Sequence, residues 1–133
     1  MKVVSLILFA VFSYFGFGCS DISRNAEDLK VEFSWGDMKP CGMGIPEIAV
    51  TGLPENTKYL VVRMYDHAYL WDHGKIKVAY NGSNIITEEV LEGIEKPCPP
   101  DVPGRYKVTV KALDENETVI GVGSKERYFP EKK

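Results

Sequence analysis

The sequence predicts an all-β fold of the β-sandwich type, and three observations carry this prediction. Short segments rich in β-branched and aromatic residues recur along the chain, often with apolar and polar residues alternating. Segments rich in Gly, Pro, Asn and Asp separate them, as turns do. Only one short segment shows a helical signal. Strands at this spacing are typical of a sandwich or a related all-β fold with at most one or two short helices.

The expected strands follow one another from residue 31 to residue 129. The clearest alternates over residues 105–113, with Tyr106, Val108, Val110 and Ala112 on one face. The others are expected at 31–35, 48–50, 57–65, 75–80, 118–122 and 125–129.

The helical candidate is the segment 87–94, with Thr87 as the expected N-cap and acidic residues in the first turn. Gly93 is expected to end it. Because the segment is short, we expect it to form at most a short helix within an all-β fold.

The charge balance excludes some functions. The chain carries 16 basic and 19 acidic side chains, a net charge of −3, and its basic residues are scattered. Nucleic-acid binding needs a positive footprint, so no nucleic-acid partner is expected. A non-specific hold on anionic lipid through charge is disfavoured for the same reason.

The N-terminal segment predicts export. Residues 3–18 are apolar and follow Lys2, a run shorter than the roughly 20 residues that span a bilayer. Residues 16–20, Gly-Phe-Gly-Cys-Ser, resemble a bacterial lipoprotein processing site. We therefore expect a signal peptide over 1–18, a lipidated Cys19 with a polar tether over 19–28, and one domain over 29–133. An ordinary secretory signal or an uncleaved anchor are the alternatives. All three place the domain outside the cytoplasm, on the periplasmic or cell-surface side.

The cysteines support the same compartment. If Cys19 is lipidated, Cys41 and Cys98 remain as an even pair of the chain's three cysteines. Export favours a disulfide between them, and free buried thiols are the alternative. The bridge would close a loop of more than about 50 residues, worth about 4 kcal/mol in the chain-entropy model.

Four segments in chain order carry a family resemblance. Residues 33–57 contain a Cys-Gly pair, a proline and a Pro-x-x-Thr turn. Residues 60–66 form an expected strand that ends in an aspartate, and residues 71–73 place a histidine after an aromatic residue. Residues 97–114 run from a proline-rich loop through an Arg-Tyr strand to Ala-Leu-Asp. Together they resemble the phosphatidylethanolamine-binding protein family, which includes the Raf-kinase-inhibitor-like proteins and small bacterial relatives.

The resemblance implies a Greek-key β-sandwich with a shallow pocket that accepts phosphate-like anions. It implies pocket roles for Asp66, His73, Pro100 and Tyr106. His73 and Tyr106 are expected to donate hydrogen bonds to an anionic oxygen, and Asp66 to orient a donor or to bind a ligand amine. Arg105 is expected to form a structural ion pair.

The chain departs from the family pattern at two places. The family usually follows its pocket aspartate with a proline and a second acid, whereas His67 and Ala68 stand here. The family's second pocket histidine, just before the Arg-Tyr pair, is replaced by Gly104. One donor is therefore missing, and His67 would replace it only if it points into the same cavity.

Two acid–imidazole pairs, Asp66-His67 and Asp72-His73, raise the hypothesis of a metal site. No third motif supplies the geometry, so neither a metal nor a cofactor is expected. Nothing resembles a nucleotide loop, a nucleophile elbow or a paired-carboxylate hydrolase, and no enzymatic activity is expected.

The sequence thus predicts a membrane-anchored, non-catalytic binding protein. Its ligand would be a small anionic or phosphorylated group, such as a phospholipid headgroup, or an acidic side chain of a partner protein. The alternative is an immunoglobulin-like structural or protein-interaction module with a vestigial pocket.

Overall fold

The computed structural model describes residues 22–42, 44–99 and 103–131. Strands make up 52% of these residues and helical turns 4%, which confirms the all-β prediction. Among the described residues, no helix has the length and apolar character needed to cross a membrane.

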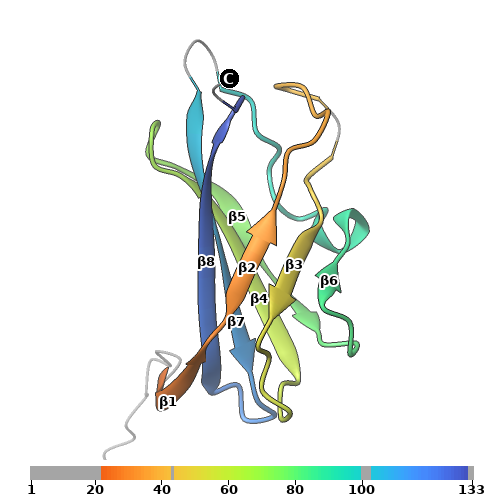
Figure 1. The fold of residues 1–133 in the computed structure, drawn as a ribbon, viewed down its shortest axis with the longest axis vertical. Helices are drawn as coiled ribbons and strands as arrows, with labels where there is room; N and C mark the ends of the chain where they lie inside the picture. Colours follow the sequence, from red (N-terminus) through yellow and green to blue (C-terminus); the bar gives the residue numbers. More distant parts are fainter. Residues whose placement is uncertain (1–21, 43, 100–102, 132–133) are drawn as a thin grey trace, which may run out of the picture.

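The strands form two sheets that pack as a sandwich (Figure 1). The larger sheet has the order β1-β8-β7-β4-β5, and the smaller has the order β2-β3-β6. Strand β1 runs parallel to β8, and the other neighbours are antiparallel. The strands are β1 (Ile22–Asp28), β2 (Lys30–Phe33), β3 (Ile48–Thr51), β4 (Tyr59–Asp66), β5 (Trp71–Ala79), β6 (Ile85–Ile86), β7 (Gly104–Leu113) and β8 (Val119–Phe129).

Alternation along the strands builds the core between the sheets. In β7, Tyr106, Val108, Val110 and Ala112 are buried, as their alternation predicts, while the residues between them are only partly buried. The smaller sheet contributes buried apolar residues from β2, β3 and β6 to the same cluster. A single core therefore joins the two sheets.

The prediction of a polar tether over 19–28 is wrong for residues 22–28, the part of it that the structure describes. Ile22–Asp28 is strand β1, and it pairs with the edge of β8, for example through Asp28 and Val122. Edge pairing uses backbone groups, so it needs no apolar alternation in the side chains. Leu29 then lies directly against Gly121 and Gly123, where a side chain on β8 would block its approach. The expected signal peptide and Cys19 lie outside the described residues.

The helix expected over 87–94 is reduced to a 3₁₀ turn, η1 (Glu88–Leu91). Thr87 stands at its N-cap but makes no side-chain capping bond. The amide of Ile94 donates to the carbonyl of Leu91 at 2.9 Å, which closes a three-residue step. Leu91 and Ile94 are both buried in the core, so packing and not helix propensity shapes this segment.

Candidate functional site

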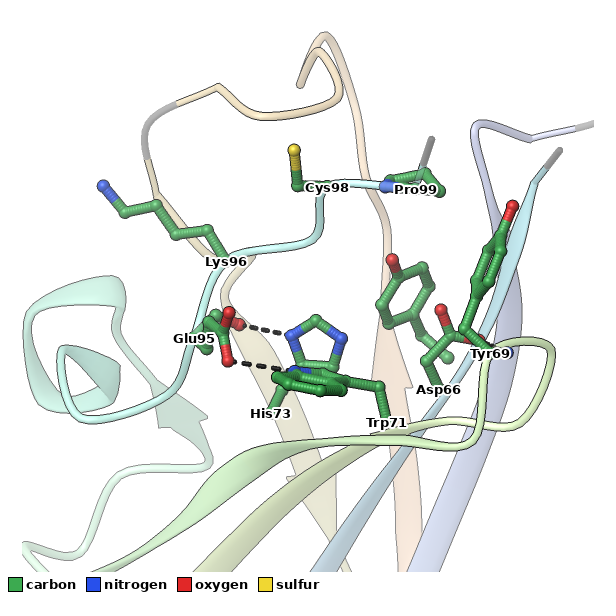
Figure 2. A pocket seen from close by; sticks show the side chains of 9 residues that line it. Asp66, Tyr69, Trp71, His73, Glu95, Lys96, Cys98 and Pro99 are labelled. Atoms are coloured by element: carbon green, nitrogen blue, oxygen red, sulfur yellow. Dashed lines mark hydrogen bonds between the residues drawn. The ribbon is translucent and has the colours of Figure 1, made fainter. Parts of the chain in front are cut away.

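A pocket lies at the end of the sandwich where β4 finishes and β5 begins (Figure 2). Three of the predicted site residues line it: Asp66 from β4, His73 from β5 and Tyr106 from β7. Pro100 lies outside the described residues, and its neighbour Pro99 contributes to the wall. The remaining lining residues are Tyr69, Trp71, Glu95, Lys96 and Cys98.

Strand register explains why Asp66 and Tyr106 meet. They are partners across β4 and β7, and both point to the inner side of the sheet. Facing residues of an antiparallel pair have their Cβ atoms about 5 Å apart. Two residues separated by 40 positions in the sequence are therefore neighbours because of the pairing alone.

A bulge in β5 brings His73 to the same side. Met64 pairs with Gly74 and Tyr65 pairs with Asp72, so His73 is the extra residue between two pairs. Simple alternation from Gly74 would direct His73 outward, and the bulge turns its side chain inward instead. Gly74 has a φ of +116°, a conformation that glycine adopts without strain. Gly74 therefore allows the bulge that brings His73 into the pocket.

Asp66 holds the backbone around the pocket. Its side chain is 2% exposed, and Oδ1 accepts hydrogen bonds from the amides of Ala68 at 2.8 Å and Arg105 at 3.0 Å, with a longer one from Tyr69 at 3.4 Å. These bonds fix the β4–β5 turn and tie it to β7. This carboxylate thus has a structural task whether or not it also meets a ligand.

Tyr106 supplies a neutral phenol to the pocket floor. Its residue is 1% exposed, and this burial raises the pKa of its hydroxyl well above the ordinary value. The charge of Asp66, with which the hydroxyl is hydrogen-bonded, raises the pKa further. Because a carboxylate can only accept, the hydroxyl proton is directed to Asp66. The expectation that Tyr106 donates a hydrogen bond to an anionic oxygen is therefore wrong for this geometry, because the phenol has only one proton.

His73 is held by a backbone clamp and is 7% exposed. Its Nδ1 lies 2.9 Å from the carbonyl oxygen of Glu95, and the amide of Glu95 donates to the carbonyl of His73 at 2.7 Å. A carbonyl only accepts, so Nδ1 carries a proton and Nε2 is the nitrogen left for a ligand. The imidazole lies 5.2 Å from the Tyr106 ring, centre to centre.

The rim carries charges that sequence reasoning did not identify as site residues. Lys96 lines the pocket and makes no ion pair with any described residue. The carboxylate of Glu95 accepts a hydrogen bond from Nε1 of Trp71 at 3.0 Å. The only sequence signal for Lys96 was its closeness to Cys98 and the proline-rich loop. Trp71 lines the pocket and is exposed, so it stands on the rim.

The other predicted residues face elsewhere. His67 packs edge-on against Tyr65, 4.9 Å between ring centres, and lines a separate hollow with Arg63 and Lys107. It therefore does not replace the missing donor. The alternation of β4 continues past Asp66, so the next residue points to the outer side of the sheet.

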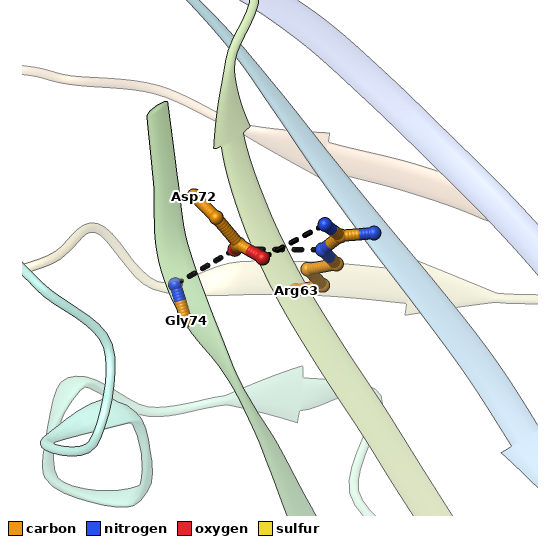
Figure 3. A network of polar contacts seen from close by, with 3 residues as sticks. All are labelled: Arg63, Asp72 and Gly74. Carbon is orange, nitrogen blue, oxygen red and sulfur yellow. Dashed lines mark hydrogen bonds and ion pairs between the residues drawn. The ribbon is translucent and has the colours of Figure 1, made fainter. Parts of the chain in front are cut away.

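Asp72 also faces the outer side, where it pairs with Arg63 (Figure 3). The Asp72 carboxylate lies 2.8 Å from Nη2 of Arg63 and accepts the amide of Gly74 at 3.0 Å. The hydrogen bond from Arg63, followed by that from Gly74, lowers the pKa of Asp72 below its usual value. The two acid–imidazole pairs thus do not converge. Over residues 22–42, 44–99 and 103–131, no group of three or more His, Cys, Asp or Glu side chains is placed to hold a metal ion.

The predicted disulfide between Cys41 and Cys98 is present. It joins the segment after β2 to the pocket wall, and the amide of Cys41 also donates to the carbonyl of Pro97 at 3.0 Å. Both cysteines are exposed. A disulfide is compatible with an extracytoplasmic location.

Gly104 fills the place where the resembled family carries its second histidine. A Cβ at this position would stand 2.7 Å from Oδ2 of Asp66 and would also meet the ring of Tyr106. The contact between Asp66 and Tyr106 therefore requires a residue without a side chain here.

Neither a protein-family model nor a curated protein matches this sequence. The function proposed below therefore rests on the geometry of the pocket and on the four resembling segments.

Proposed function

We propose that this protein is a non-catalytic binding protein of the phosphatidylethanolamine-binding type, which holds a small anionic or phosphorylated ligand in the pocket. The observation that carries the proposal is the convergence of Asp66, His73 and Tyr106. The resemblance named these residues from separate segments, and they line one pocket.

The charge distribution suggests where an anion binds. His73 Nε2, once protonated, and the ammonium of Lys96 are the two positive groups that line the pocket. Asp66 lies deeper and is already occupied by backbone amides, so it repels an anion from the floor. An anionic oxygen is therefore expected at the rim, between His73 and Lys96. A ligand that also carries an amine can direct it toward Asp66 or Glu95.

We further propose that the protein acts outside the cytoplasm, anchored to a membrane through a lipidated Cys19. The apolar segment 3–18 and the cysteine after it support the anchor, and the disulfide supports the compartment.

The test uses residues 20–133, which contain every described residue, the whole core and the disulfide. Titration calorimetry with O-phosphoethanolamine and with inorganic phosphate should show saturable binding, because the His73 ring and the Lys96 ammonium can each donate a hydrogen bond to the anion. His73→Ala and Lys96→Gln should each weaken binding about tenfold, as the loss of a charge-assisted hydrogen bond does. Lys30→Gln, a lysine on the opposite sheet, should bind like the parent. No binding to the parent, or equal binding to His73→Ala, would defeat the proposal.

A second candidate is an interaction module whose pocket no longer takes a ligand. The observation that favours it is the closed floor, where Gly104 allows Asp66 and Tyr106 to satisfy each other. In that case both phosphate probes fail to bind while the variant His73→Ala folds as well as the parent.

A further inference from the structure

The outer face of the five-stranded sheet carries a concentration of positive charge. Along the strands of this sheet, the residues that face the smaller sheet are buried, and the residues between them point away from the core. We call these outward positions of β4, β5 and β7 the basic face. Its cations are Arg63, Lys75, Lys77, Arg105, Lys107 and Lys111.

Pairing removes half of these charges. Arg63 is paired with Asp72, Lys77 with Glu117, and Arg105 with Glu126. Lys75, Lys107 and Lys111 form no ion pair with any residue that the structure describes. The basic face and the three carboxylates paired with it therefore carry six positive and three negative charges, an excess of three positive charges on a chain whose net charge is −3. Two of these carboxylates also lie near the lysines: Glu126 stands opposite Lys107, and Glu117 lines one hollow with Lys75 and Lys111.

The strand register gives the spacing of these three lysines. Lys75 stands opposite Arg63, which stands opposite Thr109, and Lys107 and Lys111 flank Thr109 two residues away on either side. With about 4.8 Å between strands and about 3.4 Å per residue, the three positions form a triangle with sides of roughly 12 to 14 Å. A single small anion cannot bridge them. Three lysines in a triangle can all contact a flat anionic surface at once, whereas one extended acidic chain would follow a line and would not reach all three.

A cluster of four acidic side chains lies away from the basic face. Glu47, Glu88, Glu89 and Glu92 line a hollow beside β3 and η1, on the side of the smaller sheet. The molecule is thus polarised across the sandwich, and an anionic surface would attract one face and repel the other.

The expected anchor precedes this same sheet in the chain. Strand β1 is an edge strand of the five-stranded sheet, and the apolar segment 3–18 comes shortly before it in the sequence. A membrane attachment there, on which this point depends, would keep the basic face within reach of the bilayer.

We propose that the basic face lies on the anionic headgroups of a membrane and orients the domain, with Lys75, Lys107 and Lys111 as the principal contacts. The net negative charge of the chain conceals this surface, because scattered lysines in the sequence meet only through the pairing of three strands. The pocket is a separate site on the inner side of the sheet's end.

The test measures partitioning of residues 20–133, without any acyl chain, onto vesicles. Binding is expected with phosphatidylcholine–phosphatidylglycerol vesicles and not with phosphatidylcholine alone, and it should weaken as salt is raised. Each lysine is expected to contribute about fivefold, so the double variant Lys75→Gln/Lys111→Gln should lose about twenty-five-fold. The matched control Lys30→Gln/Lys39→Gln has the same net charge on other surfaces and should change by less than about twofold.

Equal loss in the two double variants, or equal binding to both kinds of vesicle, would overturn the proposal. So would binding to polyglutamate without binding to anionic vesicles, which would indicate an acidic polypeptide instead. The variant His73→Ala tests whether vesicle partitioning uses the pocket. If His73→Ala abolishes it, the headgroup is recognised in the pocket and the basic face is not the contact. If only the phosphate titration fails, the proposed ligand site in the pocket is refuted and the proposed role of the basic face is not.

Discussion

His73 and Glu95 hold each other through two backbone-directed hydrogen bonds, although 22 positions separate them. The amide of Glu95 donates to the carbonyl of His73, and Nδ1 of His73 donates to the carbonyl of Glu95. The imidazole is therefore positioned by the main chain of the segment that forms the pocket wall. The side chain at position 95 is not needed for this clamp.

The clamp predicts the tautomer of the free protein. Long-range ¹H–¹⁵N correlation spectra of the neutral ring should show a protonated Nδ1 and an unprotonated Nε2 at His73. Glu95→Ala should keep this pattern, because the partner is the carbonyl. A proton found on Nε2 in the neutral ring would contradict the clamp.

Gly104→Ala should destabilise the fold by about 1 to 3 kcal/mol, the usual cost of overpacking. The added methyl would press on the Tyr106 ring and on the carboxylate of Asp66. Urea unfolding measures the loss. In a Tyr106→Ala background the same substitution should cost clearly less, because the ring is gone. Equal costs in both backgrounds would show that the ring is not what excludes a side chain.

Tyr106 should make the protein sensitive to alkali. Its folded pKa is raised, so the neutral hydroxyl stabilises the fold fully below the ordinary tyrosine value, and this contribution is lost as the pH rises above about 10. In that range Tyr106→Phe should lose about 1.4 kcal/mol less stability per pH unit than the parent. Tyr128→Phe, a change at a ring that is 43% exposed, serves as the control in the same urea titrations. Parallel curves for the parent and Tyr106→Phe would refute the prediction.

Removal of the disulfide should act on both stability and the pocket. The bridge spans 57 positions, so the double variant Cys41→Ser/Cys98→Ser should lose about 4 kcal/mol. Because Cys98 lines the pocket, binding of O-phosphoethanolamine should weaken even at temperatures where the variant is folded. Unchanged affinity in a folded variant would mean that the wall keeps its position without the bridge.

Two features could be predicted from the sequence. The buried face of β7 was predicted from its alternating residues, and the disulfide was predicted from the number of cysteines and the expected compartment. Strand β1 could not be predicted in this way, because an edge strand joins the sheet through its backbone and shows no apolar pattern. The helical signal at 87–94 was overruled by the burial of Leu91 and Ile94.

The site was predictable as residues but not as geometry. The family resemblance named Asp66, His73 and Tyr106, yet plain alternation would direct His73 outward, and only the bulge before Gly74 turns it into the pocket. His67 was expected to join them on condition that it faced the same cavity, and strand parity sends it to the other side. Lys96 could not be predicted from side-chain alternation, because it lies in an irregular segment. The disulfide at Cys98 holds this segment at the pocket wall.

The most direct test of the anion-binding proposal is the ¹⁵N resonance of His73 Nε2 during titration with O-phosphoethanolamine. The proposal predicts that Nε2 shifts to the value of a protonated, hydrogen-bonded nitrogen and saturates with one ligand per protein, at a pH where the free ring is neutral. An unchanged Nε2 resonance at ligand concentrations that saturate binding in the calorimeter, or no binding at all, would contradict it.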